Sequence, residues 1–272
     1  MITVAHPNQV AAELIGRDYV SYSALSLYQQ CPLRFFFKYV AGLPEQTVAA
    51  SLVFGGAIHR AVEFHFNELL AGNGPAHLDT LLAEYHEAWR ERETAEVRFG
   101  KDDDQSTLSG LAERMLRAFQ ASEMSQPAGT ILGVEEQFRG AFADGCPDLL
   151  ARVDLLVETA DALVISDLKT ARSRWGRDQA EDAAGQLLLY SELVGRLMPG
   201  KPLRLEFVII TKAKEPVIDR LPVALDPKRA ARMSSIAQRV WRAIEGQHFY
   251  PSPSPMNCPT CPFRAPCRAW AG

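Results

Sequence analysis

Two kinds of segment are missing from this sequence. No uninterrupted apolar stretch is long enough to span a bilayer. The first residues, MITVAHPNQVAAELIGRDY, lack the basic start and the apolar run of a signal peptide. We therefore expect a cytoplasmic protein with no membrane partner. Internal repeats and long linkers are also missing, so nothing in the chain marks a boundary between domains.

An excess of positive charge is lacking as well. The 272 residues carry a net charge of −4, which argues against a surface that is basic all over. A local basic groove stays compatible with this value, because affinity for phosphate depends on where the Lys and Arg residues lie. The apolar fraction of 47% allows a substantial core, and the charged fraction of 23% is ordinary for a soluble protein.

Cysteines are few, but four of the five lie near the two ends of the chain. Cys258, Cys261 and Cys267 form C-x2-C-x5-C in a proline-rich tail, Cys31 lies in QCPLRFFFKY, and Cys146 is isolated in a turn. In a cytoplasmic protein a disulfide framework is not expected, whereas clustered cysteines bind metal or carry out redox chemistry. The tail has few apolar residues, so a metal would supply the stability that packing does not.

The spacing of these cysteines leaves the metal open. Zinc and iron–sulfur clusters both accept four thiolates. A zinc ribbon pairs two C-x2-C knuckles, and the second knuckle is missing here, which favours iron–sulfur. Unpaired thiols in a loose tail are the remaining alternative. Either metal would join residue 31 to residue 258 and close most of the chain into one loop.

Hydrophobic periodicity predicts an α/β fold with a mixed sheet. Strands are expected at 130–142, 149–158, 162–169, 203–212 and 216–223. Helices are expected from Ser21 or Ser23 to residue 30, from Gly55-Gly56 through AIHRAVEFHFNELL, and at 78–98, 107–123, 178–196 and 227–246. The tail after residue 248 is expected to be irregular.

The stretch ARVDLLVETADALVISDLKTA carries the strongest chemical signal. Asp154 lies in one expected strand, and Asp167 and Lys169 lie at the end of the next. Side chains two apart on a strand point to the same face, and a hairpin could bring Asp154 beside Asp167. Two adjacent carboxylates need a cation, and Mg²⁺ or Mn²⁺ prefers such oxygen ligands. The ammonium of Lys169 could orient a water molecule or stabilise charge developing on a phosphate. An isolated Asp-x-Lys is more often a solvated turn; the preceding apolar run, residues 162–165, favours a buried site.

Several other polar residues fit the same site. His59 follows the two glycines on a helix, whereas His65 and His77 have no better interpretation than ordinary core or surface histidines. Glu135 and Glu136 lie in the first of the three strands and point to opposite faces, so at most one of them can join the site.

Gln186 and Tyr190 are four apart on one helix and therefore share a face. Ordinary helix packing is the alternative interpretation for this pair.

Taken together, these motifs resemble the RecB-like branch of the PD-(D/E)XK nucleases, over nearly the whole chain. The resemblance is greatest to the iron–sulfur members, which include the AddB nuclease domain and the CRISPR-associated RecB-like exonucleases. FGGAIHRAVE is similar to the family's Gly-x-x-x-His helix, ARVDLL to its Gly-Arg-Ile-Asp strand, ISDLKTA to its acid-x-Lys core and GQLLLYSEL to its Gln-x-x-x-Tyr helix. Ala151 stands where the family has Gly.

The resemblance implies a role for each matched position. His59, Asp154, Asp167 and the carbonyl of Leu168 would bind Mg²⁺ or Mn²⁺, with Glu135 favoured over Glu136 as a further acid. Lys169 would be catalytic, and Gln186 and Tyr190 would place DNA or water. A [4Fe–4S] cluster, with structural Zn²⁺ as the alternative, would be bound by the four cysteines, namely Cys31, Cys258, Cys261 and Cys267.

The resulting expectation is one nuclease domain over 1–272 with a restriction-endonuclease-like mixed sheet flanked by helices. Segments 1–50 and 248–272 would form the cluster-binding region, and 51–247 the nuclease core. The motif G-x-x-x-x-G-K-[ST] is missing, so any helicase or other repair or defence partner would be a separate chain.

The expected function is that of a metal-dependent DNA exonuclease acting on DNA ends or single strands. Basic and aromatic residues after the acid-x-Lys motif could hold the strand or simply form a solvated helix start, namely Arg172, Arg174, Trp175 and Arg177. A non-catalytic DNA-binding or assembly module on the same fold is the alternative. A redox protein is a third interpretation, which the complete carboxylate centre disfavours.

Overall fold

A six-stranded mixed sheet forms the centre of the computed structural model, which describes residues 6–93 and 95–271. The strand order is β1-β5-β6-β7-β8, and β4 pairs with β5. β1 runs parallel to β5 and β6 parallel to β7, whereas the other pairs are antiparallel. The strands are β1 (Tyr19–Ser21), β4 (Thr130–Gly140), β5 (Asp148–Glu158), β6 (Leu163–Ala171), β7 (Leu203–Thr211) and β8 (Ile218–Val223). The expected mixed sheet is therefore confirmed.

Strand β5 changes its neighbour halfway along one edge. β4 pairs with it from Leu149 to Glu158 and so occupies the other edge throughout. On the shared edge, β6 pairs with β5 only as far as Leu155, opposite Ser166. β1 pairs with it at Asp148–Leu150. The sheet consequently forks between these two contacts, just where Asp154 and Asp167 would have been the next pair.

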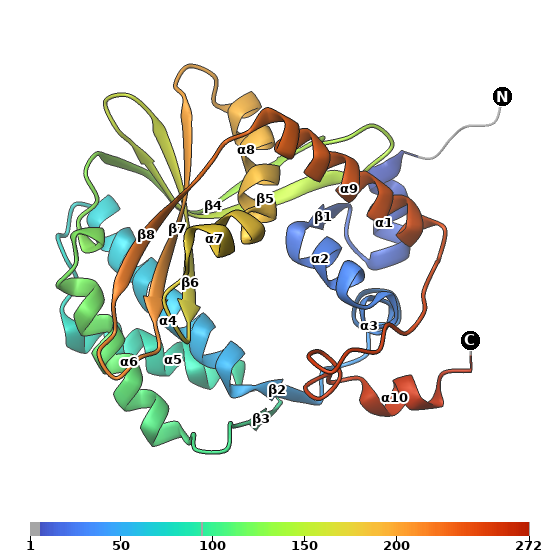
Figure 1. The fold of residues 1–272 in the computed structure, drawn as a ribbon, viewed down its shortest axis with the longest axis horizontal. Coiled ribbons are helices and arrows are strands. Elements are labelled where there is room, and N and C mark those ends of the chain that lie inside the picture. The colour runs from blue at the N-terminus through green and yellow to red at the C-terminus, as the bar shows by residue number, and fades with distance from the viewer. Residues whose placement is uncertain (1–5, 94, 272) are drawn as a thin grey trace.

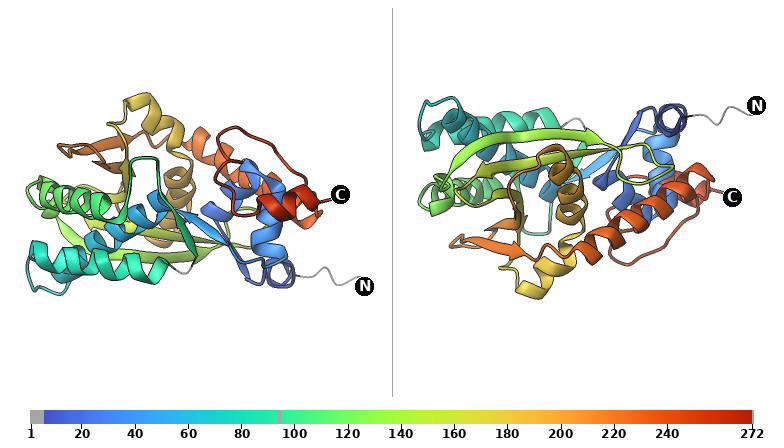
Figure 2. Two further views of the ribbon diagram at one scale, coloured as in Figure 1. Left: turned by 90° about the horizontal axis from the view of Figure 1, so that it is seen from below. Right: turned by 90° about the horizontal axis from the view of Figure 1, so that it is seen from above.

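Helices cover both faces of the sheet (Figures 1 and 2). One face packs against α4 (Ala50–Leu70), α5 (Leu78–Arg92) and α6 (Gln105–Gln120). The other face packs against α2 (Tyr22–Gln30), α7 (Arg177–Ala183), α8 (Gly185–Leu197) and α9 (Pro227–Glu245). Each face has its own continuous apolar core, so the sheet is fixed from both sides and its polar fork is held between two packed layers.

Short elements complete the chain. They are α1 (Pro7–Ile15), α3 (Pro32–Phe35), a π-helical turn at Phe36–Val40, β2 (Thr47–Ala49), β3 (Glu96–Arg98), a 3-10 turn at Glu123–Ser125 and α10 (Arg264–Ala269). β2 and β3 form a separate parallel pair. None of the described helices has both the length and the hydropathy that a membrane crossing requires.

Four expectations about helices need correction. The helix predicted at 78–98 ends at Arg92, because residues 96–98 pair with β2 instead. The helix predicted to open at Gly55-Gly56 already begins at Ala50. The helix predicted at 178–196 is divided before Gly185, where the Cβ of any other residue would lie only 2.8 Å from the hydroxyl of Tyr22. The tail expected to be irregular contains α10.

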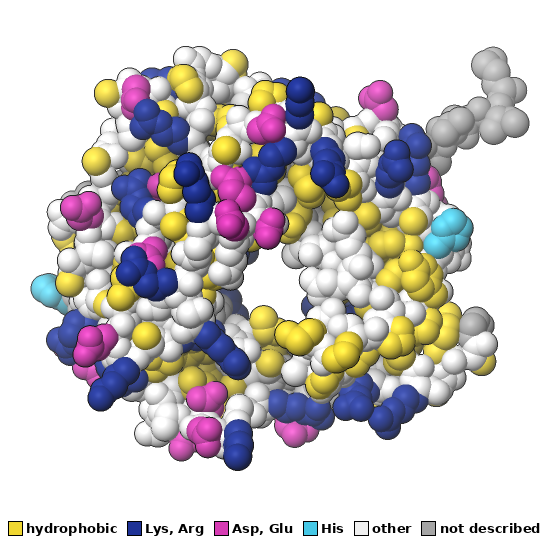
Figure 3. Space-filling model, in the orientation of Figure 1, with side chains coloured by type: hydrophobic (Ala, Val, Ile, Leu, Met, Phe, Trp, Pro, Cys, Tyr) yellow, Lys and Arg dark blue, Asp and Glu magenta, His cyan; other side chains and the backbone are white. Residues whose placement is uncertain are grey.

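Residues 6–50 and the C-terminal tail up to residue 271 lie side by side at one end of the molecule (Figure 1). The hydroxyl of Tyr28 donates to the carbonyl of His248 over 2.6 Å, and the amide of Leu33 donates to the carbonyl of Tyr250 over 3.0 Å. Between this end and the sheet, Figure 3 shows an opening through the molecule. The end of β6 and the start of α4 border that opening (Figure 1).

Candidate active site

The fork of the sheet places Asp154 and Asp167 on two strands that have just separated. Because the ladder stops at Leu155 and Ser166, the amide of Leu168 has no backbone acceptor on β5. The carboxylate of Asp154 accepts from it over 2.7 Å. The side chain of Asp154 thus takes the place of a backbone carbonyl as the acceptor. This bond fixes one carboxylate oxygen, and the second oxygen remains available to another partner.

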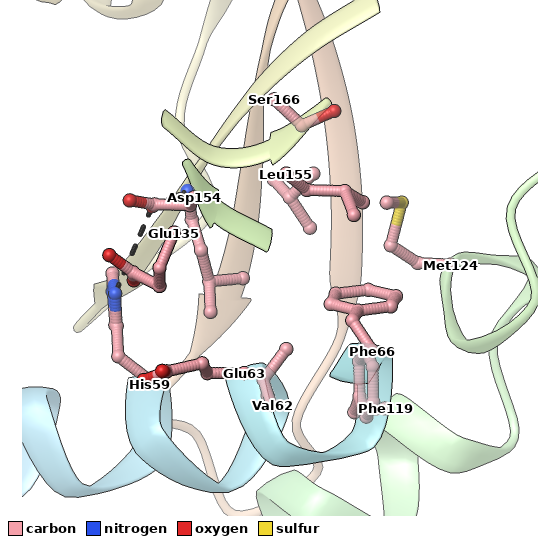
Figure 4. A pocket seen from close by; sticks show the side chains of 12 residues that line it. His59, Val62, Glu63, Phe66, Phe119, Met124, Glu135, Asp154, Leu155 and Ser166 are labelled. Atoms are coloured by element: carbon pink, nitrogen blue, oxygen red, sulfur yellow. Dashed lines mark hydrogen bonds and ion pairs between the residues drawn. The ribbon is translucent and has the colours of Figure 1, made fainter. Parts of the chain in front are cut away.

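Three ligand atoms converge at this point. The nearest ligand atoms of His59 on α4, Glu135 on β4 and Asp154 on β5 all lie within 4.8 Å of one another. Nδ1 of His59 is 3.8 Å from a carboxylate oxygen of Asp154. Figure 4 shows His59 reaching from α4 toward the two acids, while Glu63 lies along the helix beside it. Imidazole and carboxylate are both ligands of divalent ions, so the donor set fits Mn²⁺ or Mg²⁺.

The backbone of Glu135, the member of this group on β4, has an unusual conformation. Its φ is +52°, in the left-handed region that non-glycine residues rarely adopt. Such a conformation costs on the order of 1–3 kcal/mol and persists only where the surrounding structure enforces it. Glu136 is exposed, whereas Glu135 is half-buried and reaches the site. Of the two alternatives, the structure therefore brings Glu135 to the site.

Asp167 is buried, with 3% of its surface exposed, and Lys169 contacts its carboxylate, as strand alternation predicts. The contacted oxygen Oδ2 is fully enclosed, and the ammonium of Lys169 is its partner. Asp167 lies outside the group of three ligand atoms within 4.8 Å. A buried carboxylate next to a second buried acid is an arrangement that a bound cation would stabilise.

The electrostatics of the site follow from burial and crowding. Burial and the neighbouring Asp167 raise the pKa of Asp154 to about 8, although Lys169 opposes the shift. Burial also raises the pKa of Asp167, against the attraction of Lys169. For Glu135, burial raises the pKa, while its ion-pair partner Arg152 lowers it. Without a cation, the acids therefore retain protons at a pH where isolated carboxyls have lost them.

The pKa of His59 shifts in the opposite direction. Burial, followed by the charges of Lys169 and Arg92, lowers its pKa to about 4. The carbonyl of Leu168 lies close enough to the ring to act against this shift. At neutral pH the imidazole is consequently uncharged, which is the form that binds metal.

Gln186 and Tyr190 lie behind the acids on α8. Tyr190 is buried, and burial raises its pKa to about 12. Its hydroxyl lies within reach of the side chain of Gln186 and the backbone of Arg152. The charges of Asp167 and Asp154 act on Tyr190, so the structure brings this pair near the carboxylate centre, although neither residue lines the pocket or the groove there.

Tyr22 is a site residue that sequence reasoning missed. It is the first residue of α2, and the charges of Lys169 and Asp167 both act on its hydroxyl, while burial raises its pKa. The break before Gly185 makes the room it occupies. No local pattern indicates this position, because only the packing of α2 against the start of α8 creates it.

Other residues expected near the site have different partners. Arg174 binds Asp219 with two hydrogen bonds, of 2.7 and 2.6 Å. Trp175 packs edge-on against Phe207, with ring centroids 5.3 Å apart. Arg174 is therefore already paired, and Trp175 is part of the core packing. Arg172 and Arg177 are exposed.

His65 and His77 behave as the sequence indicated. His65 is fully buried, and its Nε2 lies 2.8 Å from the carbonyl of Ser125. His77 precedes α5. Neither belongs to the group of ligand atoms.

The four end cysteines line one cavity of about 240 Å³. Burial raises the pKa of Cys267, and the thiols of Cys31, Cys261 and Cys258 raise it further. No three of these sulfurs lie within 4.8 Å of one another, since the carboxylate–histidine group is the one set of described residues that does. The cysteines share a cavity but do not form a closed ligand set.

The tail carries more apolar contacts than its composition indicated. Phe263 is 1% exposed and packs on Phe37, and Trp270 packs on both Phe36 and Phe37. Cys146 lies apart from this region, buried in the core beneath α8 and α9, where burial raises its pKa to about 11.

Comparison with known proteins agrees with this geometry. A sequence profile of the PD-(D/E)XK nuclease superfamily matches residues 19–268. No curated protein matches the chain. A crystal structure from Eubacterium rectale, described provisionally as an exonuclease, aligns with a TM-score of 0.57 and 15% identity over 99% of this chain and 94% of that one. At this identity, the likeness concerns the fold alone.

A second solved structure, of the protein SSO0001, covers 91% of this chain and 95% of its own, with a TM-score of 0.35 and 14% identity. Such a low score carries no weight. The profile match spans most of the chain, including the forked sheet and the segments that carry the four end cysteines. The chain belongs to the PD-(D/E)XK nuclease superfamily, whose members require divalent metals, and this membership implies DNA as its substrate.

Proposed function

We propose that the protein is a Mg²⁺- or Mn²⁺-dependent DNA exonuclease of the RecB-like branch, acting on DNA ends or single strands. The observation that carries the proposal is the forked sheet, which gathers His59, Glu135 and Asp154 within 4.8 Å beside the enclosed carboxylate of Asp167. The opening shown in Figure 3 borders the same strand end and favours a single strand as the substrate.

In this proposal His59, Glu135, Asp154 and Asp167 hold the metal, together with the carbonyl of Leu168. The bound ion would supply Lewis acidity toward the phosphodiester. Lys169, held against Asp167, places a positive charge where negative charge develops on the scissile phosphate. Gln186 and Tyr190, close to the two aspartates, would help to place DNA or water. The neutral His59 and the buried acids are already in position before any substrate arrives.

For the cysteine cavity we propose a [4Fe–4S] cluster bound by Cys31, Cys258, Cys261 and Cys267. Four thiolates around a tetrahedral zinc, with bonds of about 2.3 Å, would lie about 3.8 Å apart. The cavity of about 240 Å³ that all four cysteines line suits a cofactor larger than a single ion. Its role would be structural, because phosphodiester hydrolysis transfers no electron.

The decisive experiment is digestion of end-labelled single- and double-stranded DNA with each end blocked in turn. Mg²⁺, Mn²⁺ and EDTA are compared, with Asp167→Asn as the matched inactive control. Stepwise release of short products from free ends, dependent on metal, is the expected result. Internal nicking of DNA with both ends blocked would show an endonuclease instead. Tight DNA binding without cleavage in either metal would favour a non-catalytic module.

A further inference from the structure

A groove of about 550 Å³ leads into the carboxylate centre, and basic side chains line much of it. Five cations border this groove, namely Arg60, Arg92, Arg152, Lys169 and Lys212. Most of them are already paired with acids. Arg60 contacts Glu63 and Glu84, Arg152 contacts Glu135, and Lys169 contacts Asp167.

Arg92 and Lys212 differ from the other three. Within residues 6–93 and 95–271, neither of them forms an ion pair. Arg92 is the last residue of α5 and is exposed, yet its charge acts on His59, so it lies close to the centre. Lys212 directly follows β7, and its amide donates to the carbonyl of Ala171 at the end of β6. Its ammonium lies 5.1 Å from the centre of the Phe54 ring.

The packing of Arg92 against α4 fixes the position of its side chain. Its guanidinium lies directly on α4 at Gly56, where a Cβ atom would collide with Nη1 and Cζ. Only glycine leaves room for the guanidinium at this position. A glycine in the interior of a helix is otherwise unfavourable compared with alanine. The local helix is therefore weakened at the point where the cation is seated.

We propose that Arg92 and Lys212 bind backbone phosphates of the DNA strand next to the scissile one and thereby hold the strand in the groove. The inference rests on the proposed nuclease function and adds two positioning residues to it. Among the described residues neither cation forms an ion pair, although the charge of Asp103 acts on Lys212. Both border the groove, and they come from different elements, the end of α5 and the residue after β7. Phosphate contacts of this kind fix the register of the strand without reading its sequence.

The test measures binding of a fluorescein-labelled 20-nucleotide oligo(dT) by anisotropy in EDTA, over a series of KCl concentrations. Arg92→Ala and Lys212→Ala are compared with Arg90→Ala and Lys214→Ala, which remove exposed cations nearby that do not line the groove. Each groove variant should lower the slope of log K against log salt by about 0.7, the value for one phosphate on a single strand. The two controls should retain the wild-type slope.

Gly56→Ala provides an independent variant. The added methyl group displaces the flexible guanidinium, while alanine favours the helix, so we expect weaker binding with an equal or higher thermal midpoint. Combined with Arg92→Ala, it should have no additional effect on binding. In cleavage assays, Arg92→Ala should raise KM more than it lowers kcat.

Wild-type slopes in both groove variants, or equal losses in the two controls, would overturn the inference. A wild-type protein that does not bind the oligonucleotide would overturn it as well. A wild-type protein that binds but does not cleave in Mg²⁺ or Mn²⁺ would refute the nuclease function alone, since the salt slopes would still assign the two phosphate contacts.

Discussion

The carboxylate centre and the cysteine cavity are two polar sites held in very different ways. The first lies between two large apolar cores, on a sheet that is packed from both sides. The second rests on a small cluster with Leu33, Phe37 and Phe263 at its buried centre. Packing has already brought the ligand atoms of the first site together, whereas the four sulfurs remain spread around a cavity. The fold alone therefore sets the geometry of the carboxylate centre, whereas the geometry of the cysteine region depends on the cofactor that it binds.

The largest expected effect tests the carboxylate centre. Asp167→Asn should lower cleavage by about a thousandfold or more, because it removes a charged group from the reacting centre. Lys169→Ala should lower it by about 10²–10³-fold. Titration with Mn²⁺ should show weaker metal binding for the aspartate variant alone. Both proteins should keep their circular dichroism spectra, since the neighbouring cores are intact. Wild-type rates in either variant would contradict the assignment.

His59→Ala should have a smaller effect on the same region. It removes one ligand and leaves the acids, so the metal concentration for half-maximal activity should rise by about 10–100-fold. Imidazole favours Mn²⁺ over Mg²⁺ relative to oxygen ligands, so the preference for Mn²⁺ should also decrease. His65→Ala is unsuitable as a control, because that ring is buried in the core. His77→Ala alters an exposed residue and should leave the metal dependence unchanged. An identical dependence for His59→Ala would show that it is only a helix residue.

The cysteine region should respond through stability rather than chemistry. Cys258→Ser should lose iron, lower the thermal midpoint by several degrees and make the tail susceptible to limited proteolysis. Sulfide and iron analysis after anaerobic purification measures the first effect. The matched control is Cys146→Ala, which should keep its iron. Serine at position 146 would place a hydroxyl in the apolar core and is a poorer control. A folded protein with four free thiols and no metal would contradict the proposed dependence.

The smallest effect concerns pH. A pKa of about 8 for Asp154 in the folded state, against 3.8 as the ordinary value, means that the folded protein holds a proton that the unfolded chain releases. The free energy of unfolding of metal-free protein should therefore fall as pH rises. The lowered pKa of His59 has the opposite effect on the free energy of unfolding, which it makes rise with pH, but only below about pH 6.5. From pH 6.5 to 8 we expect the midpoint in EDTA to fall by a few degrees.

Asp154→Asn should flatten this decline, and Mn²⁺ at pH 8 should raise the wild-type midpoint by binding the folded state alone. An equal decline in the asparagine variant would locate the responsible group elsewhere.

Residue patterns predicted the strands and motifs that depend only on residues close together in the sequence. The strands around Asp154 and Asp167 follow from alternation and short turns, and their motif order indicated the family. The sequence could not predict β1 and β3, because strands of three residues exist only through pairing with distant segments. For the same reason the positions of Tyr22 and Arg92 had no local signal: each reaches the centre through the packing of one helix against another element.

The fork itself also lies beyond sequence patterns. Alternation predicts that β5 and β6 pair, but not that pairing stops between Leu155 and Asp154. That depends on β1 taking over the edge of β5, and β1 comes from the start of the chain. The left-handed backbone of Glu135 is similarly enforced by its surroundings rather than by its residue type.

The contact between Tyr28 and His248 has a consequence for how the protein is made. The two residues are 220 positions apart, and the bond closes nearly the whole chain. At 5–20 residues per second, a ribosome needs about 10–40 s to synthesise the intervening segment. During that time the first helices lack the later segments of the chain that cover them, and the three cysteines of the tail have not yet been made to join Cys31. Both the closure of the molecule and the filling of the cysteine cavity therefore require that the tail has already been synthesised.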